Sequence, residues 1–127
     1  MAGDWIKVEK VTPDKPEMRI IARACGVSRA EAFLAWFRLW SHFDDMIENG
    51  FLAGFTRDDA DEMGRLKGLG LALDQTGWVI FEEHGCTVVK WDVHNGDSAK
   101  RRALDANRKR HARNGTVRHL SASEADI

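Results

Sequence analysis

The chain has 127 residues, of which 43% are hydrophobic and 31% are charged. This length fits one domain with a single core and an appendage, and no apolar run approaches the roughly 20 residues that cross a bilayer. The polar sequence after Met1 predicts no secretory leader, and the two cysteines, Cys25 and Cys86, fit a reducing, cytoplasmic compartment.

The charge is distributed unevenly, with a break near Asp97. Residues 1–96 carry 11 Lys and Arg against 16 Asp and Glu, whereas residues 97–119 carry 8 against 2. The net charge thus changes from −5 to +6 at the break. A basic segment attached to an acidic body is typical of a protein with an anionic partner, most often nucleic acid. We predict one domain over residues 1–96 and a basic helix or arm over residues 97–127 that ends in a disordered tail.

The chain begins with a segment that reads as a short strand or an extended arm, because polar and apolar residues alternate over Trp5–Glu9. A helix follows from Pro16 to about Cys25. We expect Asp14 to cap its free amides, Pro16 to occupy its first turn, and Gly26 to end it in the left-handed conformation.

A second, more apolar helix begins at a capping box, in which Ser28 is followed three residues later by Glu31. Apolar residues surround this helix almost completely, so we expect it to be central and buried as far as Ile47. Asn49-Gly50 predicts a turn, and Phe51–Phe55 predicts a brief strand.

Two further helices are predicted after that strand. The first begins at Thr56, with acidic residues in its first turns that suit the positive end of the helix dipole. The second is a short apolar helix over Gly70–Gln75, which we expect to stop at Gly77.

The last predicted elements are a hairpin and the basic helix. The hairpin joins Trp78–Glu82 to Thr87–Trp91 through a turn at Glu83–Cys86. The basic helix begins at Asp97 or Ser98 and runs through Arg113, and we expect Asn114-Gly115 to end it.

This order of elements predicts an α+β fold that is mostly α. Helix–strand–helix–helix–strand–strand is the order of a winged helix, a winged helix-turn-helix domain in which a short strand joins the hairpin in a three-stranded sheet. Periodicity alone allows other small α+β folds as well.

Short motifs spread over most of the chain carry a family resemblance. They are Trp5-Ile6-Lys7, Leu39-Trp40, Glu48-Asn49-Gly50-Phe51-Leu52, Gly77-Trp78, Trp91-Asp92-Val93-His94-Asn95-Gly96 and Ser98-Ala99-Lys100-Arg101-Arg102-Ala103. With these motifs, the stretch from Trp5 to Arg110 resembles the N-terminal winged-helix domain of phage and mobile-element replication proteins, the initiators and replisome organisers. The resemblance implies a DNA-binding module of replication initiation in a bacterial cell or a phage-infected host. Because such proteins often continue into a helicase-loading or ATPase part, it also implies a stand-alone version or an excised domain.

The basic segment supplies the main candidates for DNA contact. Its cations lie on several faces of the predicted helix without a wide apolar stripe, which suits a helix or arm that lies against phosphates. The alternative interpretation is a solubilising charged tail. The candidate residues are Lys100, Arg101, Arg102, Asn107, Arg108, Lys109, Arg110 and Arg113.

The predicted helix pair and the wing supply weaker candidates. In a helix-turn-helix the second helix enters the major groove, so Arg65, Lys67 and Gln75 are candidates for groove contacts, and Arg57 is a candidate for a phosphate contact. Lys90 is the basic residue of the hairpin region. The alternative interpretation is that these elements only complete the core and the surface.

No motif predicts an enzyme, a metal site or a cofactor. Asp44 and Asp45 near His42 lack a second, paired carboxylate motif, and the glycines after residue 63 lack the Lys-Ser/Thr of a phosphate loop. We therefore expect double-stranded DNA as the partner, with a homodimer and a replisome or helicase-loading protein as further candidate partners and no membrane. A winged-helix transcriptional regulator and a replisome protein-interaction module remain the alternative functions.

Overall fold

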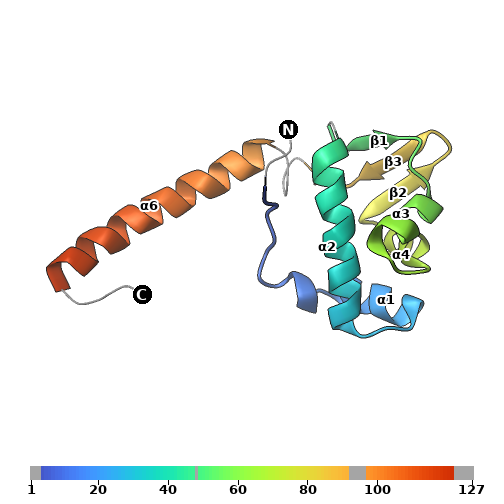
Figure 1. Ribbon diagram of the computed structural model, residues 1–127, viewed down its shortest axis with the longest axis horizontal. Coiled ribbons are helices and arrows are strands. Elements are labelled where there is room, and N and C mark those ends of the chain that lie inside the picture. Colours follow the sequence, from blue (N-terminus) through green and yellow to red (C-terminus); the bar gives the residue numbers. More distant parts are fainter. Residues whose placement is uncertain (1–3, 48, 92–96, 122–127) are drawn as a thin grey trace.

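The computed structural model describes residues 4–47, 49–91 and 97–121, and within the last range the side chains of residues 100–112. The fold is α+β and mostly helical, with five α-helices and one three-stranded antiparallel sheet among the described residues. Helix α2 lies at the centre, with α1, α3, α4 and the sheet on one side, while α6 projects away on the other (Figure 1). This arrangement is compatible with a winged-helix-like fold.

The first helix, α1, spans Pro16–Cys25 and follows an extended arm and a 3-10 turn, η1, over Thr12–Asp14. Gly26 ends α1 in the left-handed conformation with φ of 68°, as predicted. The predicted Asp14 cap is wrong, because Lys15 occupies the cap position with no side-chain hydrogen bond. Asp14 lies one residue too early in η1, and its carboxylate pairs instead with Arg29 at 3.4 Å.

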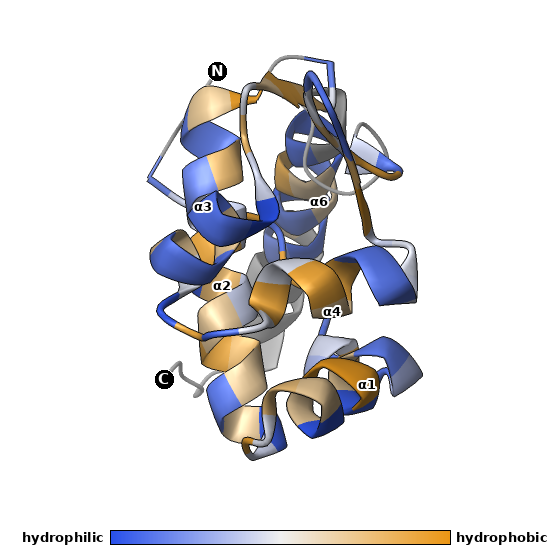
Figure 2. Ribbon diagram, turned by 90° about the vertical axis from the view of Figure 1, so that its right-hand side faces the viewer, coloured by the Kyte–Doolittle hydropathy of each residue, from blue (hydrophilic) through white to orange (hydrophobic). Residues whose placement is uncertain are grey.

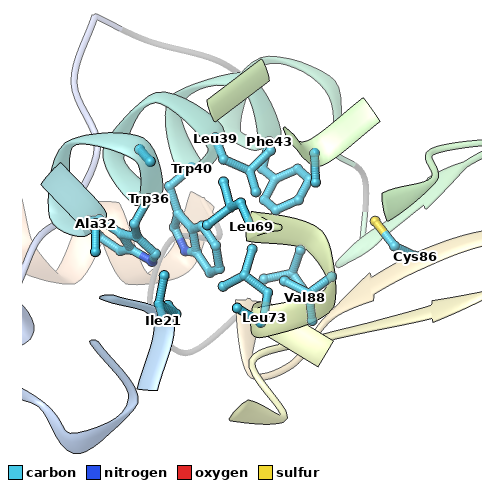
Figure 3. Packing of buried hydrophobic residues seen from close by; sticks show 14 of the residues in the cluster. Ile21, Ala32, Trp36, Leu39, Trp40, Phe43, Leu69, Leu73, Cys86 and Val88 are labelled. Atoms are coloured by element: carbon cyan, nitrogen blue, oxygen red, sulfur yellow. The ribbon is translucent and has the colours of Figure 1, made fainter. Parts of the chain in front are cut away.

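Helix α2 spans Arg29–Met46 and begins at the predicted capping box of Ser28 and Glu31. Its apolar side chains form most of the core together with side chains from α1, α4 and the sheet (Figure 3). The α2 residues in this core are Ala32, Ala35, Trp36, Leu39, Trp40 and Phe43.

The sheet consists of β1 (Phe51–Ala53), β2 (Val79–Glu82) and β3 (Gly85–Val88) in the order β1-β3-β2. The short strand β1 thus joins the hairpin, as predicted, and Leu52 and Phe81 both lie opposite Cys86 in the register. Gly85 has φ of 149°, and a Cβ there would collide with the Leu52 carbonyl oxygen. The close pairing of β1 with β3 therefore requires glycine at this position.

Helices α3 (Arg57–Gly64) and α4 (Leu69–Thr76) form the predicted pair. Thr56 and Asp59 form a second capping box at the start of α3. At the start of α4, the Asp61 carboxylate accepts hydrogen bonds from the amides of Gly68 at 2.9 Å and Gly70 at 2.7 Å. Asp61 therefore caps the neighbouring helix from across the turn.

The last helix, α6, spans Asp97–Ser121. The predicted stop at Asn114-Gly115 is wrong, because the helix continues through both residues. Each of them weakens a helix interior by at most about 1 kcal/mol, which does not compel a break. The predicted boundary at residue 96 and the tail beyond Ser121 lie outside the described residues. Within the described chain, no helix combines the length and apolar character needed to cross a membrane.

Candidate nucleic-acid interface

The exposed surface of α6 carries a cluster of cations between residues 101 and 110. They are Arg101, Arg102, Arg108, Lys109 and Arg110. At about 100° per residue, these five lie within roughly 200° of the helix circumference. The cations therefore form one broad face, which we call the basic face of α6.

Local polar contacts reduce the charge of the basic face only in part. Arg108 pairs with Asp105 at 2.7 Å, and Arg110 donates to the Asn107 amide oxygen at 3.3 Å. Both contacts lie on exposed surface, where such pairs contribute little and exchange readily for another partner. Arg113 falls among the residues whose side chains are not described.

Lys100 differs from the other predicted phosphate contacts. Its ammonium lies 2.5 Å from the Asp44 carboxylate of α2, and their side chains are only 9% and 5% exposed. The same ammonium lies 5.2 Å from the centroid of the Trp5 ring. Lys100 thus joins α6 to the body and to the N-terminal arm, so we remove it from the residues placed to neutralise phosphate.

The predicted groove residues lie on or near the α3–α4 pair. Arg65 and Lys67 are exposed in the turn between the helices, and Gln75 is exposed on α4. The guanidinium of Arg57 pairs with Asp74, with Nε 3.2 Å from the carboxylate, so its charge is already matched. Figure 2 shows α4 as mainly hydrophobic, and no cation lies on this helix.

The hairpin offers little to an anion at its tip. The two-residue turn holds Glu83 and His84, and Glu82 precedes it on exposed surface. Lys90 lies at the other end of β3, where its φ of 61° places it in the left-handed region. The structure therefore separates Lys90 from the turn of the hairpin and places it beside Trp91 at the edge of a cavity.

That cavity is the feature that sequence reasoning missed. It has a volume of about 590 Å³ and lies between the N-terminal arm, the start of α1, α2 and the ends of the hairpin. The tryptophans in its wall are Trp36, Trp40, Trp78 and Trp91. The available signal was the spacing of Trp36 and Trp40, which places both on one face of a helix.

Neither thiol is primed for chemistry at neutral pH. Burial raises the pKa of Cys86 to about 11, and burial together with the charge of Asp61 raises the pKa of Cys25. Across the described residues, no three His, Cys, Asp or Glu side chains converge to form a metal site.

In comparisons of this chain with protein-family models, with curated proteins and with solved structures, no match is found.

Proposed function

We propose that this chain is a winged-helix DNA-binding protein of phage or mobile-element replication initiation, acting in the cytoplasm of a bacterial cell or a phage-infected host. The observation that carries the DNA-binding part is the basic face of α6. Five exposed cations lie within an arc of about 200° on a helix whose first turn is fixed to the body by Lys100 and Asp44. The link to replication rests on the sequence resemblance.

In this proposal the basic face supplies most of the affinity for duplex DNA. Phosphate neutralisation releases counterions, and it dominates affinity in most protein–DNA complexes. The turn between α3 and α4 would add contacts from Arg65 and Lys67. Because α4 carries no cation and only Gln75 as an exposed amide, we expect this helix to contribute less to base reading than the second helix of a typical helix-turn-helix.

The test is the salt dependence of duplex binding, measured by fluorescence anisotropy with the full chain. Neutralising n phosphates gives a slope of log K against log salt of about −0.9n. Three double variants are compared with the wild type: R101Q/R102Q on α6, R65Q/K67Q in the turn, and R19Q/R23Q on exposed α1 as the matched control.

We expect R101Q/R102Q to make the slope less steep by about 1.8 and R19Q/R23Q to leave it unchanged. If R101Q/R102Q and R19Q/R23Q reduced the salt slope equally, the attraction would be nonspecific, and the basic face would not be part of the interface. Absence of duplex binding at low salt would refute the proposal. A footprint then separates the two DNA-binding roles, since an initiator occupies repeated sites at an origin and a transcriptional regulator covers a promoter.

A further inference from the structure

The cavity beside α2 has the size and the walls of a small-molecule site. Its volume of about 590 Å³ lies within the range of about 300–1,000 Å³ that is usual for ligand pockets. Its wall contains aromatic surface: the partly buried Trp78 meets Trp40 edge to face at 6.2 Å between ring centroids, and Trp40 stacks on Trp36 behind it at 5.1 Å. Planar aromatic ligands bind well against such surfaces.

The lining of the cavity carries three lysines against two glutamates, an excess of one positive charge. Lys7, Lys15 and Lys90 line it together with Glu9 and Glu17. The Lys15 ammonium lies 2.9 Å from the Glu9 carboxylate and 5.8 Å from the centroid of the Trp78 ring. Since the Lys15–Glu9 pair is partly exposed to solvent, an anionic group of a ligand can replace Glu9 at little cost.

The backbone at Lys90 supports a binding role. Its left-handed conformation is unfavourable for a residue with a side chain, and such residues are enriched at ligand sites. This conformation sets an exposed lysine at the edge of the cavity, next to Trp91.

One ligand chemistry meets both the aromatic lining and the excess of lysines. A nucleotide has a flat base for the indole surface, and its phosphate provides the anion for the lysines. An apolar peptide side chain supplies only the contact with the indoles, and a free phosphate supplies only the anion.

We propose that this cavity binds one nucleotide, with its base against Trp78 and its phosphate toward Lys15 and Lys90. The nucleotide comes from either of two sources, a free mononucleotide or an unpaired nucleotide of single-stranded DNA. The site is independent of the proposed duplex binding, because none of the α6 residues with described side chains, 100–112, lines the cavity.

Tryptophan fluorescence of the full chain tests this site. The protein is titrated with thymidine monophosphate and, separately, with a short single-stranded oligothymidylate. The test variant is Lys90→Gln, which alters an exposed residue. Arg23→Gln on α1 is the control for lost surface charge, and R101Q/R102Q excludes strand binding by the basic face. Circular dichroism confirms that each variant is folded.

We expect saturable quenching. Lys90→Gln should raise the dissociation constant about tenfold, the effect of one charge-assisted hydrogen bond, while Arg23→Gln and R101Q/R102Q should leave the dissociation constant unchanged. Quenching by the mononucleotide identifies a free nucleotide as sufficient, and quenching by the oligonucleotide alone identifies a single strand as the source. Absence of saturable quenching at millimolar ligand, or a dissociation constant that Lys90→Gln does not alter, overturns the proposal.

Discussion

Breaking the ion pair between Lys100 and Asp44 should destabilise the protein far more than breaking an exposed pair. Both side chains are more than nine-tenths buried, and their charged atoms lie 2.5 Å apart. Removing one partner leaves the other charge buried and uncompensated, which costs about 3–5 kcal/mol in a rigid interior. Because the first turn of α6 can move away from the body and let water reach the remaining charge, we expect about 2–3 kcal/mol for each single variant.

A double-mutant cycle with Asp44→Asn, Lys100→Met and the double variant isolates the pair. The free energy of unfolding is measured by urea denaturation, followed by tryptophan fluorescence. Since the double variant buries no lone charge, its loss should be well below the sum of the single losses, with a coupling energy of about 2 kcal/mol.

The matched control is the exposed pair of Asp14 and Arg29, whose atoms lie 3.4 Å apart and whose side chains are 73% and 49% exposed. Its cycle, with Asp14→Asn and Arg29→Gln, should give a coupling energy below about 0.5 kcal/mol. Coupling energies of equal size in the two cycles would refute the conclusion that burial makes Lys100 the anchor of α6.

Three further predictions concern the body of the protein. A Cβ at Gly70 would lie 2.5 Å from the Arg57 carbonyl oxygen, so Gly70→Ala should lower the unfolding free energy by about 1–3 kcal/mol in urea denaturation; an unchanged midpoint would show that α3 and α4 separate freely. Asp61→Ala should cost about 1–2 kcal/mol because α4 loses its cap, and Asp61→Asn should recover part of this; equal losses would contradict the capping role. Burial raises the pKa of Cys86 from 9.0 to about 11, so its contribution to stability is complete below pH 9 and is lost as the pH rises toward 11. Unfolding free energies measured across this range should fall by about 2 kcal/mol more in the wild type than in Cys86→Ala, and parallel curves would disprove this assignment.

The sequence was sufficient where the determining contacts are local. The Ser28 and Glu31 box and the left-handed stop at Gly26 follow from residues close in sequence. The joining of β1 to the hairpin is not local, and it was predicted from the winged-helix order of the elements. Asp14 and Asp61 show the limit of this reasoning. Asp14 precedes α1 and Asp61 lies in α3, so the local sequence suggests that each acts on its own helix. In the structure Asp14 pairs with Arg29, and Asp61 caps α4 across a turn.

The candidate site was predicted less well, for the same reason. The cationic composition of α6 could be predicted from the sequence, whereas the burial of Lys100 depends on a partner 56 positions away in the sequence. Likewise, the cavity requires α2, the arm and the hairpin to meet, so Trp36 and Trp78 individually indicate only packing. Tertiary contacts of this kind have no signature in the local pattern of one chain.

The length of α6 has a geometric consequence. Its 25 residues rise about 1.5 Å each, which gives a rod of about 37 Å, close to one turn of B-DNA. One end of the rod is fixed at Lys100, so its far end stays at a nearly constant distance from the body. The basic face covers residues 101–110, so its cations lie within about 15 Å of this anchor along the helix axis. Whatever binds both the body and the basic face must therefore present two contact regions about that close together.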